Sequence, residues 1–94
     1  MSMYACRLMD ISSGHFCFPP QLALQASEDV FINNRGAHRQ GDLWQVHCCI
    51  GCHPGFLAIG STTVFVNGRG LGRVGDQISC GSLVMTGSTD VLAG

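Results

Sequence analysis

Apolar residues occur in this chain as short bursts, and glycine interrupts nearly every window of ten residues. The bursts, such as residues 30–32 and 64–66, are rich in valine, isoleucine and phenylalanine, which favour strands. A glycine inside a helix costs about 1 kcal/mol relative to alanine, so long helices are disfavoured. The best helical candidate, residues 20–28, is short and weak. The pattern therefore predicts an all-β fold of short hairpins.

Two of the bursts belong to an internal repeat. Residues 30–42 align with residues 64–76, and eight of the thirteen aligned positions are identical, where chance gives about one. Each copy is predicted to form a β-hairpin that begins with Val-Phe-Ile or Val-Phe-Val and returns through Arg-x-Gly-Asp. The turn between the strands, Asn33-Asn34 or Asn67-Gly68, requires positive φ, which asparagine and glycine tolerate.

Two shorter motifs extend the repeat to three units. Arg-x-x-Asp and Ser-x-x-Val alternate along the chain, and each occurs three times, at residues 7–10, 39–42 and 73–76 and at residues 27–30, 61–64 and 88–91. Three like units are expected to pack around a pseudo-threefold axis, because each buries an apolar face that it could not bury alone. Each aspartate is expected to cap a turn or pair with its arginine.

The composition excludes several classes of protein. The 94 residues are expected to form one domain, residues 1–94, which at this size usually needs a metal, disulfides or a partner. Charged residues make up 12% of the chain and the net charge is -1, so nucleic-acid binding has no electrostatic basis. No apolar stretch approaches the roughly 20 residues that span a bilayer, and no export signal is visible. A cytoplasmic protein is expected unless a dedicated machine exports it.

The six cysteines could form three disulfides, but a reducing compartment favours metal ligation or burial. Cys6 and Cys17 are interpreted as small buried apolar residues. Cys48, Cys49 and Cys52 lie within five residues, where neighbouring cysteines rarely bridge each other. The Cys49-x-x-Cys52 spacing is that of a zinc knuckle, yet the chain lacks the second pair that a zinc ribbon needs.

Three metal-ligating residues lie at nearly equivalent positions of the three units. His15 and His47 each follow the aspartate of their unit by five residues, and Cys80 follows its aspartate by four. His53 is expected to be the fourth ligand, on a loop of residues 51–55 that can fold back, with Cys48 or Cys52 as the alternative. Three imidazoles and a thiolate make a closed tetrahedral set that suits one zinc ion per chain better than iron.

Other polar residues give little support for catalysis. His38 aligns with Gly72 and is interpreted as an exposed loop residue. Neither a Gly-x-Ser-x-Gly elbow nor a His-Glu-x-x-His helix occurs in the sequence. A metal-dependent enzyme would also need an open coordination position, which four protein ligands do not leave. The chain is therefore not expected to be an enzyme.

Residues 60–68 read Gly-Ser-Thr-Thr-Val-Phe-Val-Asn-Gly and are followed by Arg-Val-Gly-Asp at residues 73–76. This combination resembles the PAAR-repeat family, and the Cys80-Gly81 step and residues 86–91 also fit its pattern. The resemblance covers residues 7–94. The Pro-Ala-Ala-Arg motif itself is replaced by Gly-Ala-His-Arg and Gly-Leu-Gly-Arg, which keep only the arginine.

The resemblance implies a small cone whose metal, held by three histidines and one cysteine, lies near the apex. It implies a structural tip, one chain per trimer, that caps a trimeric β-helical spike, either the VgrG protein of type VI secretion or a phage tail spike. Such a tip waits in the cytoplasm until contraction ejects it, and it contacts the target membrane only transiently. Without room for a fused toxin, it would carry an effector non-covalently. The rival interpretation is a zinc-binding regulatory or nucleic-acid module built on residues 48–53.

Overall fold

The computed structural model of the protein describes residues 2–94, and within that range the chain forms short antiparallel strands and no helix. The predicted all-β class is confirmed, and residues 20–28 are not helical. No segment of the described chain forms a helix that is long and apolar enough to cross a membrane. The strands are β1 (Met3–Tyr4), β2 (Phe31–Ile32), β3 (Arg35–Gly36), β4 (Leu43–Cys48), β5 (Cys52–Phe56), β6 (Phe65–Val66), β7 (Arg69–Gly70) and β8 (Leu92–Ala93).

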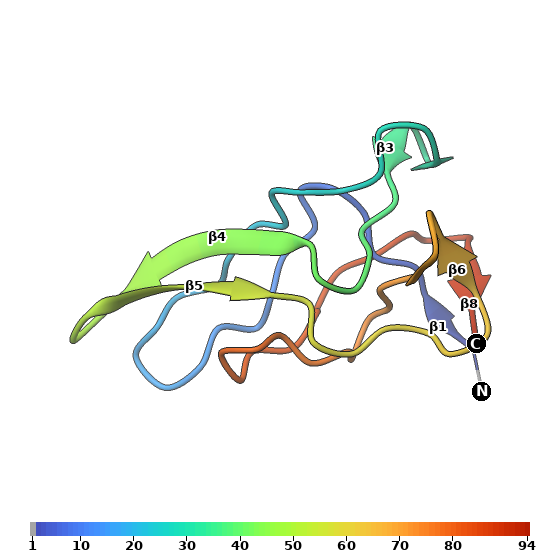
Figure 1. Cartoon of the computed structure of the whole chain (residues 1–94). Helices are drawn as coiled ribbons and strands as arrows, with labels where there is room; N and C mark the ends of the chain where they lie inside the picture. Colours follow the sequence, from blue (N-terminus) through green and yellow to red (C-terminus); the bar gives the residue numbers. More distant parts are fainter. Residues whose placement is uncertain (1) are drawn as a thin grey trace.

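Three small strand pairs, β2–β3, β6–β7 and β1–β8, repeat one arrangement at one end of the molecule (Figure 1). The predicted turns are confirmed, because Asn33 and Asn34 have φ of 53° and 65°, and Asn67 and Gly68 have φ of 53° and 75°. The third pair joins segments from opposite ends of the sequence in the same register. The predicted return strands are too long, because β3 and β7 each end after two residues.

After each small pair, the backbone forms hydrogen bonds with a different unit, and these bonds surround the pseudo-threefold axis. The backbone amide of Cys6 donates to Gly72, that of Gly72 donates to His38, and that of His38 donates to Cys6, at 2.8, 2.8 and 3.0 Å. An apolar cluster with equivalent members from each unit surrounds this ring: Ala5, Ala37 and Leu71 with Ile32, Val66 and Ala93. The predicted packing of three units is therefore confirmed.

The Arg-x-x-Asp and Ser-x-x-Val motifs each make one contact three times. In every unit the aspartate accepts hydrogen bonds from the backbone amide and the guanidinium of its arginine, as predicted: Arg7–Asp10, Arg39–Asp42 and Arg73–Asp76. In every unit the serine hydroxyl accepts the amide of the valine three residues later: Ser27–Val30, Ser61–Val64 and Ser88–Val91. These local bonds cap turns that the short strands leave open.

The interpretation of His38 as an exposed loop residue is wrong. His38 is fully buried because it lies on the axis, where Cys6 and Gly72 are its equivalents. Its Nδ1 lies 2.7 Å from the carbonyl oxygen of Gln25, and its ring packs edge-on against Trp44. A second apolar cluster begins at this ring contact and contains Cys6, Ala23, Trp44, Leu57, Ile78 and Val84. The alignment of His38 with Gly72 was misleading, because a position that is glycine in one unit can be a buried side chain in another.

The hairpin β4–β5 extends from the second cluster to the opposite end of the molecule, away from the three small pairs (Figure 1). The principal extents of 36, 27 and 21 Å reflect this elongation. One end therefore consists of three like pairs, and the other consists of one hairpin with the loops beside it.

Candidate metal centre

A β-bulge in β4 determines which way His47 points. Between the pairs Trp44–Gly55 and His47–His53, β4 advances three residues while β5 advances two. In a regular strand, Trp44 and His47 would lie on opposite faces, because they are separated by an odd number of residues. The extra residue restores both to the buried face, so that Trp44 enters the core and His47 lies directly across from His53.

The other two candidate ligands lie on loops. His15 begins a tight turn in which its backbone pairs with that of Phe18, at 3.1 and 2.8 Å. Cys80 precedes Gly81, whose φ of 104° a side chain would strain. The Cys80 loop approaches β5 closely, since a Cβ on Gly55 would lie 3.4 Å from Sγ of Cys80. The same Cβ would lie only 2.9 Å from Cγ2 of Ile78, so the glycine at residue 55 leaves room for Ile78 beside the thiol.

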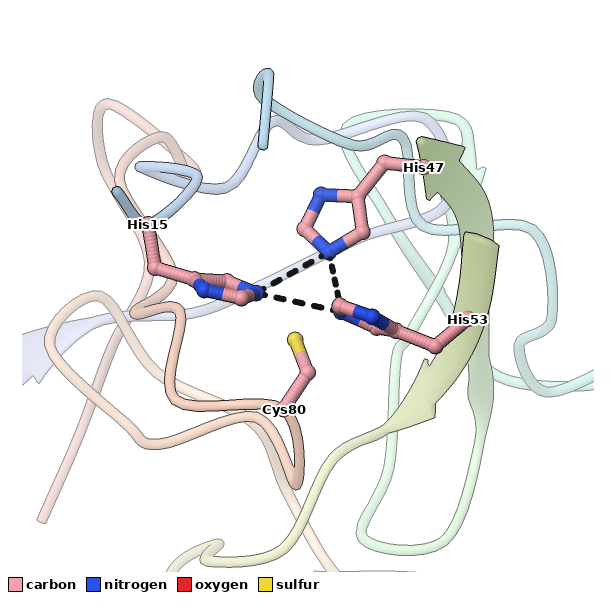
Figure 2. Close-up of side chains that lie close together, drawn as sticks. All are labelled: His15, His47, His53 and Cys80. Atoms are coloured by element: carbon pink, nitrogen blue, oxygen red, sulfur yellow. Dashed lines mark hydrogen bonds between the residues drawn. The ribbon is translucent and has the colours of Figure 1, made fainter. Parts of the chain in front are cut away.

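The four side chains converge on one point (Figure 2). Nε2 of His15 lies 3.1 Å from Nε2 of both His47 and His53, and the Nε2 atoms of His47 and His53 lie 2.6 Å apart. All four ligand atoms, including Sγ of Cys80, lie within 4.8 Å of one another. A tetrahedral ion with nitrogens at about 2.0–2.1 Å separates those nitrogens by about 3.3 Å, so the cluster has the dimensions of a closed metal site.

Hydrogen bonds alone cannot satisfy this triangle of imidazoles. Each Nε2 is either a donor or an acceptor, so at least two of the three must have the same role and repel each other. The backbone carbonyl of Pro19 lies 2.7 Å from Nδ1 of His47, which places the proton there and directs a lone pair from Nε2 into the cluster. A single cation would satisfy all three nitrogens at once.

The surroundings of His53 disfavour its protonated form. Burial lowers the pKa of His53, and the neighbouring His47 and His15 lower it further. The ring of Phe18 packs against all three imidazoles with centroids 4.5–4.9 Å away. Neutral imidazole is the form that binds a metal, and the apolar ring shields one side of the cluster from water.

The comparison with known proteins decides the family. The sequence model of the PAAR motif matches residues 21–92. This chain belongs to the PAAR motif family. Two toxins of Pseudomonas aeruginosa are relatives, named NAD(P)(+) glycohydrolase toxin Tse6, from strain PAO1, and (p)ppApp synthetase toxin Tas1, from strain UCBPP-PA14. Each is 31% identical over 78 residues, which cover 76% of this chain and 18% of the relative. The chain thus spans about a fifth of the length of these relatives.

Two sequence-based expectations for the cysteines of this PAAR chain are wrong: that Cys17 is buried, and that metal ligation or burial rather than disulfides accounts for the cysteines. Cys17 is exposed rather than buried and forms a disulfide with Cys49, while Cys48 forms a second disulfide with Cys52. Because Cys49 and Cys52 lie in different disulfides, they do not form a zinc knuckle in this structure, and the rival regulatory module has no support from it. The expectation for Cys6 is confirmed, because its side chain is fully buried and burial raises the pKa of its thiol.

The four predicted ligands of this PAAR chain lie together, with His53 on a strand rather than on a loop. Cys48 and Cys52 form a disulfide with each other. His53 rather than either of these thiols therefore completes the cluster. Sequence reasoning missed Phe18, which lies too far from any repeat motif to be found. It also missed the Cys17–Cys49 bond, although both cysteines follow an aligned histidine by two residues.

Proposed function

We propose that this chain is the tip of a spike and that its three small strand pairs dock on the blunt end of a trimeric β-helical partner. The partner would be a VgrG-like protein of a type VI secretion system or the corresponding phage tail spike. One chain would cap one trimer and remain in the cytoplasm until contraction ejects the spike. The whole described chain, as one domain, would serve this mechanical role.

The observation that carries the proposal is a threefold set of exposed apolar side chains at that end. Phe31, Phe65 and Leu92 begin strands β2, β6 and β8, and their exposed fractions are 61%, 59% and 54%. The valine before each of them is exposed as well. Near-equal exposure at three equivalent positions is typical of a surface that contacts three like partners.

A trimer offers three identical surfaces around its axis, and a monomer can match them only if it repeats its own surface three times. The backbone ring of Cys6, His38 and Gly72 supplies the matching axis within one chain. The small pairs also have open strand edges, which docking would cover. These features support binding of one chain per trimer.

The opposite end would be held by a metal. His15, His47, His53 and Cys80 would supply three nitrogens and one thiolate, a set that suits zinc better than the harder ions. When bound, the ion would cross-link three separate segments of the chain. It would have no open position for a substrate, so its contribution would be structural.

The relatives support a role in delivery rather than catalysis. The two toxins are named for different activities, yet each matches this chain at the same identity over the same number of residues. The shared segment therefore does not determine which reaction a toxin performs. We propose that this chain is not an enzyme and that any effector is attached to the tip.

The docking proposal is tested by mixing the chain with the trimeric spike protein encoded in the same genome and measuring the mass of the complex. A complex of one chain per trimer is expected. The double variant Phe31→Glu/Phe65→Glu should abolish it, while Ile50→Glu should not, because Ile50 is equally apolar and 86% exposed but lies at the β4–β5 turn. Failure of the wild-type chain to bind, or equal loss with both variants, would contradict docking through this end.

A further inference from the structure

Four exposed cysteines form two disulfides beside the candidate metal centre, one between two separate segments and one within a hairpin. Cys17–Cys49 joins the turn that begins at His15 to the turn of the β4–β5 hairpin, across 32 residues of sequence. Cys48–Cys52 joins the two strands of that hairpin across 4 residues. The first bond connects separate segments, whereas the second closes a hairpin that is already paired.

The long-range disulfide connects the same two segments as the imidazole cluster. Cys17 follows His15 by two residues, and Cys49 follows His47 by two residues. The Cα atoms of the two cysteines are 5.9 Å apart, and the Nε2 atoms of the two histidines are 3.1 Å apart. The covalent bond and the histidine contact are therefore parallel links between one loop and one hairpin.

We propose that the Cys17–Cys49 disulfide is an oxidative clasp that tightens metal binding by His15, His47, His53 and Cys80. The proposal rests on the metal centre proposed above and adds a redox condition to it. In the reduced chain, only non-covalent contacts, such as that between the Pro19 carbonyl and Nδ1 of His47, hold the His15 loop against the hairpin before a metal binds. In the oxidised chain, the disulfide restricts the loop further, so less conformational freedom is lost when the metal binds.

The coupling must act in both directions. If the disulfide raises the affinity for the metal by some factor, the bound metal favours formation of the disulfide by the same factor. Couplings between two sites in one protein are typically on the order of 5–150-fold. The Cys48–Cys52 bond should contribute little, because the β4–β5 pairing already places its two cysteines opposite each other.

The oxidation needs a co-reactant, and a small-molecule disulfide such as oxidised glutathione supplies it. The thiolate of Cys17 or Cys49 attacks one sulfur of the oxidant, forms a mixed disulfide and releases one glutathione thiolate. The second cysteine thiolate attacks the mixed disulfide and releases the other glutathione. Two cysteine thiols thereby become one disulfide, and the two electrons and two protons end on two glutathione molecules. All four cysteines are exposed, so the oxidant can reach them.

The test measures affinity for Zn²⁺ by competition with a chromophoric chelator. The variant Cys17→Ser/Cys49→Ser is compared with the matched control Cys48→Ser/Cys52→Ser, each after oxidation with glutathione disulfide. The first variant should bind Zn²⁺ roughly tenfold to a hundredfold more weakly than oxidised wild type, while the control stays within about twofold of it. Circular dichroism of the Zn²⁺-loaded variants shows that both are folded.

A second measurement tests the reverse direction and needs no variant. The fraction of the Cys17–Cys49 bond is measured by alkylation and mass spectrometry in glutathione buffers, with and without Zn²⁺. Zn²⁺ should favour the bond, and by the same factor that is found for affinity. Equal affinities of the two double variants, or no effect of Zn²⁺ on the bond, would overturn the clasp. A second equivalent of Zn²⁺ bound only by the reduced chain would also overturn it, because the cysteines would then be ligands. Absence of Zn²⁺ binding by oxidised wild type would instead contradict the metal centre.

Discussion

The two ends of the molecule are stabilised in different ways. At the end with three strand pairs, three kinds of contact each occur three times: backbone bonds around the axis, Arg-x-x-Asp pairs and serine caps. At the other end, one histidine–cysteine cluster and two disulfides hold one hairpin and two loops. Repeated contacts distribute the free energy of folding over many residues, whereas a single site concentrates it in a few.

This difference predicts how mutations act. A substitution at the repeated end removes one of three like contacts and leaves two intact. A substitution at the single site removes the interaction that joins three segments. The loss of one contact should therefore cost less stability at the end with three strand pairs than the loss of the proposed metal costs at the other end.

Metal removal should have the largest effect. Structural zinc contributes on the order of 10 kcal/mol to the folding of small domains, which is comparable to the whole stability of a chain of this size. A chelator such as EDTA, or the substitution Cys80→Ser, should therefore lower the free energy of unfolding by several kcal/mol. Urea denaturation followed by Trp44 fluorescence measures this, because Trp44 lies in the cluster beneath the centre. An unchanged midpoint would show that the two ends do not differ as argued.

The next effect comes from the repeated end. Asp42 is fully buried and paired with Arg39 and Arg69, whereas Asp76 is paired with Arg73 alone among the described residues. Asp42→Asn should cost about 3–5 kcal/mol, the range for breaking a buried ion pair, and Asp76→Asn should cost less. Thermal and urea unfolding of both variants give the comparison. Equal losses would mean that the second arginine contributes nothing.

The pH dependence of stability provides a second test of the ion pairs of Asp42. Burial alone would raise the pKa of Asp42, but hydrogen bonds from the side chain and backbone of Arg39 outweigh it and hold the pKa below its ordinary value. The stabilisation is therefore present above the pKa of the unfolded carboxyl and is lost as pH falls through the lower folded pKa. Below about pH 4, the free energy of unfolding of Asp42→Asn should therefore fall less with pH than that of wild type.

Much of this architecture could be predicted from the sequence, because the repeat encodes it locally. The asparagine turns, the Arg–Asp pairs and the threefold packing follow from residue types at fixed spacing, and the register of His15, His47 and Cys80 follows from them. The bulge in β4 could not be predicted, because it depends on how Trp44 and His47 reach one face together. The Cys17–Cys49 disulfide was not predicted, because disulfides are rare in the reducing compartment that the lack of an export signal indicates.

The smallest effect should come from His38, which lies between the two ends. Burial lowers its pKa, while the hydrogen bond to Gln25 and the charge of Asp42 act the other way and the charges of Arg39 and Arg69 add to the lowering. Below the ordinary histidine pKa of about 6.5, the unfolded chain therefore binds a proton that the folded chain does not, and stability falls as pH falls. In His38→Asn, the amide can still donate to Gln25, and Nε2, which has no hydrogen-bond partner among the described residues, is removed. The variant should lose stability less steeply than wild type between pH 7 and about pH 5 in urea unfolding at a fixed metal state. Parallel profiles of the variant and wild type would show that the buried axis position does not sense pH.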